Sequence, residues 1–383
     1  MKKLKIGFVC YPTFGGSGVV ATELGKALAE KGHELHFITY SAPARMGSLK
    51  QNLYYHEVHV KEYPLFDYPP YELVLASKMV EVAKTHALDL LHVHYAIPHA
   101  SAAITARNIL AEHGLHLPIV TTLHGTDITL LGKDPAFEPV IAHAINASDA
   151  VTAVSESLKA DTCELFDVTR HIDVVHNFIC PSHFERAADE QFRQAIAPNG
   201  EFIITHISNF RPVKRLEDVL KVFHKIQANV PSKLLLVGDG PERSRIEKEA
   251  EKLGIREHVV SIGKIKNPIE PLLVSDLFLL PSKTESFGLA ALEALAAGVP
   301  VIASNAGGIP EVIEHESSGF LAEVGDVDAM AEYGTALLSD AHMLTAFRGA
   351  ARQRAWDFHV MKVLPKYESI YERLVESAKP VLG

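Results

Sequence analysis

The residues best suited to chemistry in this chain are two glutamates that flank one short segment, Glu285 to Glu293. An ionised carboxylate accepts hydrogen bonds and donates none, so it suits the hydroxyls of a sugar or ribose better than a phosphate. An apolar run at Leu277–Pro281 predicts a buried strand before the segment, and an Ala- and Leu-rich helix is predicted over Phe287–Ala297. Free N–H groups at the start of that helix suit an anion such as phosphate. The pattern indicates a sugar-nucleotide pocket, although two surface glutamates near a helix start would fit the spacing equally well.

Two cations in the same half of the chain could supply what the glutamates lack. Arg211 and Lys214 follow a predicted strand at Glu201–Ser208 and precede a predicted helix at Leu216–Ala228. Both could reach one pyrophosphate from this strand-to-helix loop, the arginine through its planar fork and the lysine as a point charge. A solvated basic loop is the alternative.

A glycine-rich loop follows the first predicted strand. Gly15, Gly16 and Gly18 lie between an apolar run at Leu4–Cys10 and a helical pattern at Val19–Lys31. This is the first unit of a doubly wound α/β domain, in which ligands bind at the carboxyl ends of the strands. The spacing is not G-x-G-x-x-G, and the next predicted strand does not end in an acidic residue, so a dehydrogenase-type dinucleotide site is disfavoured. Simple loop flexibility is the alternative for the glycines.

Histidines end two further predicted strands of this half. His92 and His94 fall on one face of the strand Asp89–Tyr95, but no third ligand is spaced near them, so hydrogen bonding is favoured over a metal pair. Tyr95 and His99 are expected at the edge of a pocket. The segment His124–Asp127 follows the predicted strand Pro118–Leu123 and combines an imidazole, a glycine, a hydroxyl and a carboxylate. An Asp or Thr helix cap with an incidental histidine is the alternative.

Composition narrows the class of protein. The chain has 383 residues, 47% of them hydrophobic and 22% charged, which indicates a globular protein of two domains. A net charge of −10 without a long basic run argues against nonspecific nucleic-acid or membrane binding. Three scattered cysteines fit a reducing compartment, and no apolar run reaches the length of a membrane span. We expect a soluble cytoplasmic protein.

Strand and helix patterns alternate twice along the chain, which predicts an α/β fold class with two doubly wound domains. We expect an N-terminal domain over residues 1–172 and a C-terminal domain over 173–359, with one helix over Asp326–Ala351. The amphipathic tail from about residue 360 to 383 is expected to pack back on the first domain.

Taken together, these motifs resemble a known family. Glu285 to Glu293 fits the E-x-F-G-x-x-x-x-E pattern of the retaining glycosyltransferases of family 4, which have the GT-B architecture of two facing Rossmann-like domains. The glycine loop, the Arg211/Lys214 pair, the turn Gly238–Gly240 and the pair Gly307–Gly308 stand in the order found in that family. The resemblance runs through nearly the whole chain.

The resemblance implies a role for each matched position. Arg211 and Lys214 would hold the diphosphate and stabilise the departing UDP, where negative charge develops. Glu285 would bind hydroxyls of the donor sugar, Glu293 the ribose diol, and His124 would lie beside the sugar. Further donor contacts are expected from Gly16, Asn209, Lys264, Ile265, Ser286, Phe287, Gly288 and Leu289. Among these, Lys264 and Ile265 would lie against uracil. Enzymes of this family are thought to retain configuration by front-face attack, without a protein nucleophile and without a metal, so we expect no cofactor.

The loops of the first half are most similar to those of family members that join N-acetylglucosamine from UDP-N-acetylglucosamine to the hydroxyl of L-malate in bacillithiol biosynthesis. The acceptor's carboxylates would need donors, and Ser17, Tyr95 and Thr126 are the positions we expect. Arg45 and Lys50 are further basic residues of this half, but nothing in their spacing singles them out. The resemblance suggests a homodimer. Another small acceptor such as an inositol phosphate or a lipid-linked sugar, a UDP-sugar epimerase, and a sugar-nucleotide binder without activity stay open.

Overall fold

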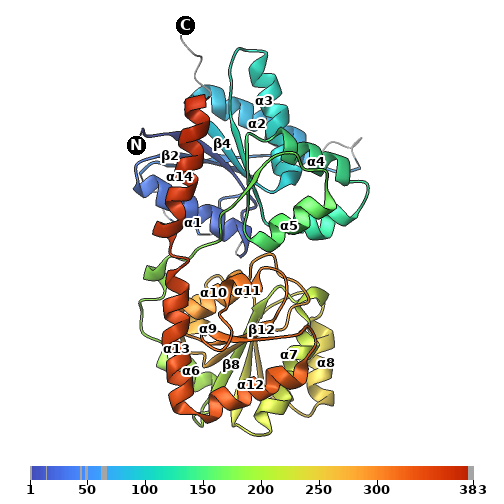
Figure 1. The fold of residues 1–383 in the computed structure, drawn as a ribbon, viewed down its shortest axis with the longest axis vertical. Helices are drawn as coiled ribbons and strands as arrows, with labels where there is room; N and C mark the ends of the chain where they lie inside the picture. The colour runs from blue at the N-terminus through green and yellow to red at the C-terminus, as the bar shows by residue number, and fades with distance from the viewer. Residues whose placement is uncertain (1, 14, 44, 48–50, 62–66, 378–383) are drawn as a thin grey trace. The chain divides into compact units, whose positions relative to one another are not determined.

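The computed structural model describes residues 2–13, 15–43, 45–47, 51–61 and 67–377, which leaves Lys50 outside the described residues. These residues form two compact units (Figure 1). The first unit joins the chain up to Asn177 with the residues from Val360 onward, and the second spans Phe178–His359. The predicted boundary at residue 172 is too early, because the strand Ile172–Val174 still pairs with the sheet of the first unit.

The described part of the first unit is built on a seven-stranded parallel sheet in the order β3-β2-β1-β4-β5-β6-β7. Its strands are β1 (Lys5–Val9), β2 (Glu34–Thr39), β3 (Leu53–Glu57), β4 (Leu90–His94), β5 (Ile119–Leu123), β6 (Ala150–Ala153) and β7 (Ile172–Val174). Its α-helices are α1 (Ser17–Glu30), α2 (Tyr71–His86), α3 (Ser101–Ala111), α4 (Glu138–Ala147), α5 (Glu156–Leu165) and α14 (Val360–Ser377). Every residue of β4 and β5 is buried, as expected for central parallel strands covered on both faces.

The C-terminal helix α14 packs on the first unit, as predicted from its amphipathic pattern (Figure 1). Tyr367 and Tyr371 are buried, and the Tyr371 hydroxyl lies 2.7 Å from Nδ1 of His92 on β4. Nε2 of His92 lies 2.8 Å from the Thr122 hydroxyl, so both of its ring nitrogens are engaged within the core. Like the other helices in the described part of the chain, α14 is not long and apolar enough to cross a membrane.

The second unit repeats the same plan with a six-stranded parallel sheet in the order β10-β9-β8-β11-β12-β13. Its strands are β8 (Phe202–Ser208), β9 (Ser232–Gly238), β10 (Val259–Gly263), β11 (Leu277–Leu280), β12 (Val301–Ser304) and β13 (Gly319–Ala322). Its α-helices are α6 (Glu190–Ile196), α7 (Leu216–Gln227), α8 (Arg243–Lys252), α9 (Ile269–Leu273), α10 (Leu289–Ala296), α11 (Ile309–Val312), α12 (Val327–Ser339) and α13 (Ala341–Trp356). One face of α7 buries Val219, Leu220 and Phe223 in the core, each contributing about 1.5–3 kcal/mol.

Each sheet has a topological switch point. In the first unit the chain moves outward from β1 to β2 and β3, then crosses back to place β4 on the other side of β1. In the second unit the same happens at β8, with β9 and β10 on one side and β11 on the other. The loops after the two strands at such a point diverge and leave a crevice, which is where α/β proteins bind ligands.

The structure corrects two predicted helix starts and divides one predicted helix into two. The helix α1 begins at Ser17 and not at Val19, because Gly16 takes a left-handed φ of 62° and turns the chain into the helix. The helix α10 begins at Leu289 and not at Phe287, because Gly288 has a φ of 97°. The single helix predicted over residues 326–351 is two, since Asp340 is extended and its carboxylate accepts hydrogen bonds that cap α13.

Candidate active site

The switch point of the second unit brings the predicted cation and carboxylate together. Lys214 follows β8 and Glu285 follows β11, and these strands are paired neighbours. Nζ of Lys214 lies 2.5 Å from Oε1 of Glu285, and the buried Ser282 hydroxyl donates to the same oxygen at 2.8 Å. A backbone bond of 2.8 Å from Lys283 N to Val213 O ties the two loops together. The Glu285 carboxylate is therefore held in one position from both strands.

Glycines in the loops after β9 and β12 allow these loops to pack against the site. A Cβ on Gly238 would lie 1.8 Å from the Ser208 carbonyl oxygen, so only glycine lets the turn after β9 pack on the end of β8. A Cβ on Gly307 would lie 2.1 Å from the Glu285 carbonyl oxygen, which also accepts a bond of 2.8 Å from Gly308 N. The loop after β12 thus rests directly on the backbone of Glu285.

The start of α10 offers backbone N–H groups beside Glu285. Phe287 is only 2% exposed, and its ring packs edge-on against Phe358 at a centroid distance of 5.7 Å, so its side chain belongs to the core. Ser286 and Leu289 are half-buried, while Gly288 precedes the helix. Glu293 is half-buried in α10, roughly 6 Å along the axis from Leu289 at about 1.5 Å per residue.

The other predicted donor residues of the second unit lie on the same edge of its sheet but are not all adjacent, whereas Gly16 precedes α1 in the first unit. Asn209 and Arg211 are exposed in the loop after β8. Lys264 and Ile265 follow β10, which lies two strands from β8, about 10 Å at the usual strand spacing. Lys264 is exposed, whereas Ile265 packs against an apolar cluster that includes Ile203 and Val237.

Sequence reasoning missed His206, which joins the two strands at this switch point. Its Nδ1 lies 2.8 Å from the Leu279 carbonyl oxygen on β11, and its Nε2 lies 2.8 Å from the Ser208 hydroxyl. Burial lowers the pKa of His206 to about 4, so the ring is neutral at pH 7. A single histidine inside an apolar strand carries no sequence signal for this role.

The switch point of the first unit brings the predicted acceptor residues together. The Ser17 hydroxyl at the start of α1 lies 2.8 Å from the Tyr95 hydroxyl after β4. Burial raises the pKa of Tyr95 to about 12, while hydrogen bonds with Ser17 and Thr126 act in the opposite direction. The backbone of Tyr95 has a φ of 85°, a strained value for a non-glycine residue that holds the ring at the loop. Three hydroxyls therefore converge beside the first turn of α1.

His124 lies in a cluster of histidines next to these hydroxyls. Its Nε2 lies 2.8 Å from Nδ1 of His94, and its ring centroid is 5.2 Å from that of Tyr95. Burial lowers the pKa of His124 to about 3, with the neighbouring His99 acting in the same direction. The rings of His94 and His124 are therefore neutral at pH 7 and can act as hydrogen-bonding groups.

The buried Asp127 holds two loops of this site together through hydrogen bonds to their backbone. Its carboxylate is fully buried and accepts bonds from Ala96 N at 2.7 Å and from Gly125 N at 3.2 Å. Burial raises its pKa to about 6, while these backbone bonds act in the opposite direction. Asp127 thus ties the loop after β5 to the loop after β4, and the helical turn Thr126–Leu130 has no side-chain cap, while Thr126 stays exposed.

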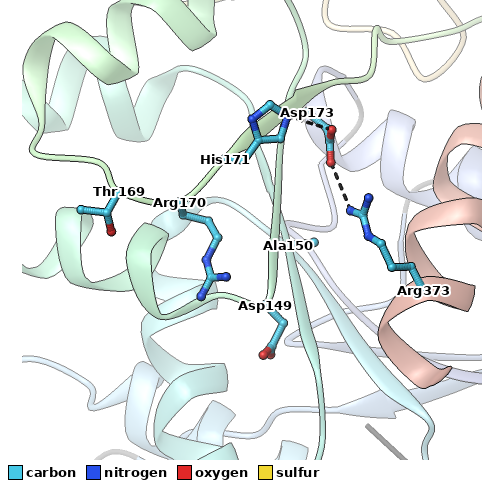
Figure 2. Close-up of a pocket in the computed structure, with 7 residues that line it drawn as sticks. All are labelled: Asp149, Ala150, Thr169, Arg170, His171, Asp173 and Arg373. Atoms are coloured by element: carbon cyan, nitrogen blue, oxygen red, sulfur yellow. Dashed lines mark hydrogen bonds and ion pairs between the residues drawn. The ribbon is translucent and has the colours of Figure 1, made fainter. Parts of the chain in front are cut away.

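Figure 2 shows a polar cavity elsewhere in the first unit, lined by Asp149, Ala150, Thr169, Arg170, His171, Asp173 and Arg373. Asp173 lies 3.3 Å from His171 and 3.4 Å from Arg373 on α14. Apart from Arg373 on α14, the lining residues lie just before β6 and β7 or in their first two residues, so the cavity lies at the amino ends of these strands. It is therefore not part of the switch-point site.

Comparison with known proteins identifies the family. Residues 14–183 match the family Glycosyltransferase Family 4, and residues 187–354 match Glycosyl transferases group 1. The chain is 49% identical over 379 residues to N-acetyl-alpha-D-glucosaminyl L-malate synthase of Bacillus anthracis, covering 98% of this chain and 99% of that protein. It is 24% identical to D-inositol 3-phosphate glycosyltransferase of Jonesia denitrificans, covering 92% of this chain and 91% of that protein.

Solved structures give the same fold at much lower identity. Anabaena HepE in complex with UDP and glucose superposes with a TM-score of 0.80 at 20% identity, covering 96% of this chain and 99% of that chain. Sucrose-phosphate synthase from Thermosynechococcus elongatus gives a TM-score of 0.78 at 20% identity, covering 98% and 100%. The chain therefore belongs to the glycosyltransferases of family 4 and is a sugar-nucleotide-dependent glycosyltransferase with the GT-B fold.

Proposed function

We propose that this chain transfers N-acetylglucosamine from UDP-N-acetylglucosamine to the hydroxyl of L-malate, with retention at the anomeric carbon, as the first step of bacillithiol biosynthesis. The single observation that carries the choice of substrates is the 49% identity, over 98% of the chain, to a synthase of that product. The paired loops at each switch point support a transferase, since they offer one set of groups suited to a sugar nucleotide and another suited to a small hydroxy acid.

On the donor side, Lys214 and Arg211 neutralise the diphosphate as the bond to the sugar breaks. The N–H groups at Gly288 and Leu289 add positive partial charge at the start of α10. Glu285 accepts hydrogen bonds from sugar hydroxyls and is held for this by Lys214 and Ser282. Glu293 accepts hydrogen bonds from the two ribose hydroxyls, and Lys264 and Ile265 contact the uracil base.

On the acceptor side, the convergent hydroxyls of Ser17, Tyr95 and Thr126 bind the carboxylates of malate, aided by the free N–H groups of the first turn of α1. Such local donors are needed because the chain as a whole carries a net charge of −10. The neutral ring of His124 positions the donor sugar. Arg45, the described one of the two basic residues considered, is half-buried in the segment after β2.

The transfer needs no covalent bond to the protein. The malate oxygen forms a bond to the anomeric carbon on the face from which the phosphate oxygen departs, and the hydroxyl proton passes to that phosphate oxygen. The bond between the anomeric carbon and the UDP oxygen breaks, and its electron pair leaves with UDP. We further propose that this step uses no metal or other cofactor, and that the protein acts in the cytoplasm as a homodimer.

The test is to incubate the protein with UDP-N-acetylglucosamine, with and without L-malate, and to follow UDP release and the anomeric configuration of the product. We expect malate-dependent release and an α-linked product that persists in the presence of a chelator. Release that ignores malate but responds to an inositol phosphate would reassign the acceptor. A change of sugar configuration without UDP release would instead indicate an epimerase. If neither UDP release nor a change of configuration is observed, the protein is a sugar-nucleotide binder without activity.

A further inference from the structure

Three histidines from three different elements of the first unit meet at one point. His36 lies on β2, His56 on the edge strand β3, and His86 is the last residue of α2. One ring nitrogen of each lies within 4.8 Å of the other two, a grouping found once among the described residues. The ring centroids are 4.4 Å apart for His36 and His86, 5.0 Å for His56 and His86, and 5.1 Å for His36 and His56.

The hydrogen bonds of His36 fix which of its nitrogens faces the cluster. Its Nε2 lies 2.9 Å from Oε1 of Glu34, and an ionised carboxylate only accepts, so this nitrogen carries the proton. Nδ1 of His36 therefore carries a lone pair and accepts a hydrogen bond of 2.8 Å from Nε2 of His56. A metal ion would replace the proton of this bond, and His56 would then carry its proton on Nδ1. A histidine that donates to a carboxylate through one nitrogen and turns the lone pair of the other inward is the usual arrangement of a metal ligand and its supporting group.

Burial and neighbouring charges disfavour protonation of His36 and His56. Burial lowers the pKa of His36, and it lowers the pKa of His56 to about 4, with His36, His86 and Lys78 acting in the same direction. Nζ of Lys78 lies 2.8 Å from Glu81, which offsets its charge. Imidazole nitrogens gathered within 4.8 Å of one another can share one metal ion, because the ion accepts a lone pair from each.

We propose that His36, His56 and His86 form a binding site for a divalent transition-metal ion, with zinc as the best match. Three imidazole nitrogens favour this class of ion over calcium or magnesium. In a tetrahedral zinc site with bonds of about 2.0–2.1 Å, the ligand nitrogens stand about 3.3 Å apart. His36 and His56 must separate by about half an ångström to reach that distance, which the half-buried His56 and His86 can accommodate. The fourth position stays open to water.

The position of the site points to a structural role. His36 pairs in register with Gly7 on β1 and with Tyr54 on β3, whose ring stacks on it at 4.9 Å. His86 ends α2 just before β4 begins, and the cluster lies on β2 and β3, whereas Ser17 and Tyr95 follow β1 and β4. A bound ion would join the edge strand β3 and the end of α2 to β2. An ion at this position would be structural and would take no part in the transfer, so the zinc site is compatible with a transfer step that uses no metal.

Zinc binding by the full chain tests this proposal. The protein is prepared without a histidine tag, stripped with a chelator, and titrated with Zn²⁺ against a chromophoric chelator, and then with Co²⁺ to follow its visible absorption. We expect one ion per chain, a rise in the thermal midpoint with zinc, and a tetrahedral cobalt spectrum. His86→Gln and His56→Gln should each weaken binding at least tenfold and abolish the midpoint rise. His143→Gln, which changes an exposed histidine of α4, should leave both unchanged.

Binding that is equal in His86→Gln, His56→Gln and the unchanged protein would overturn the proposal, as would the failure of the unchanged protein to compete for zinc. Circular dichroism of the metal-free variants shows whether they are folded. A variant that is folded but no longer binds zinc identifies the replaced histidine as a ligand. If both variants unfold, the cobalt spectrum of the unchanged protein decides, since an octahedral spectrum contradicts three imidazole ligands in a tetrahedral site.

Discussion

Replacing Gly307 by alanine tests whether the backbone around Glu285 sets the rate of transfer. Gly307 has a φ of 58°, and an alanine in that region costs about 1–2 kcal/mol. The added Cβ would also lie 2.1 Å from the Glu285 carbonyl oxygen. A backbone atom cannot rotate away as a side chain can, so the loop must shift by about 1 Å to restore an ordinary contact.

The shift has two measurable consequences. Crowding adds about 1–3 kcal/mol to the conformational cost, so we expect Gly307→Ala to lower the free energy of unfolding by about 2–5 kcal/mol. A displacement of about 1 Å at a group that positions the substrate lowers the rate about a hundredfold, or about 2.7 kcal/mol in the barrier. We expect kcat/KM for malate-dependent UDP release to fall by that factor while the protein stays folded.

Gly254→Ala is the matched control. Gly254 lies in the same unit with a φ of 71°, and a Cβ there would meet nothing within 4 Å. It should therefore carry the conformational cost of about 1–2 kcal/mol alone and keep the kcat/KM of the unchanged enzyme. The reasoning is refuted if Gly307→Ala retains full activity, or if both variants lose activity to the same extent.

Three further changes probe the two sites and the core. Lys214→Met removes the cation next to Glu285 and should lower kcat about 10²–10³-fold, with Lys252→Met on the exposed face of α8 as the control; an undiminished kcat would remove Lys214 from charge stabilisation. Tyr95→Phe removes the hydroxyl bonded to Ser17 and should raise the KM for malate about fivefold, equivalent to about 1 kcal/mol, whereas exposed Tyr68→Phe should not. Burial lowers the pKa of His92 to about 3, so the stability that its neutral ring provides is complete above pH 6.5 and is lost as the pH falls toward 3. At pH 5 the loss is about 2 kcal/mol, and thermal midpoints measured from pH 7 to 5 should fall less steeply in His92→Gln; equal slopes would contradict this.

Local patterns in the sequence determined the fold class and the loops that matter. Apolar runs followed by glycine-rich or charged turns and then by helical patterns are short-range signals, so the strands before Tyr11, Arg211 and Glu285 could be predicted one at a time. Because parallel strands place their carboxyl ends on one edge, the same patterns predicted which loops share a side of each sheet. Helix starts were less certain, since Gly16 and Gly288 adopt left-handed conformations that composition does not reveal.

Only the tertiary structure decided which of these residues touch. The strand order places β8 beside β11 and β1 beside β4, and this order alone brings Lys214 to Glu285 and Ser17 to Tyr95. Burial, a property of the whole core, turns His124 into a neutral ring and Asp127 into an anchor. The meeting of His36, His56 and His86 has no signature in the sequence, because it depends on the pairing of β2 with β3 and on where α2 ends. Sequence spacing specifies each element, whereas contacts between distant elements follow from how the sheets are ordered and packed.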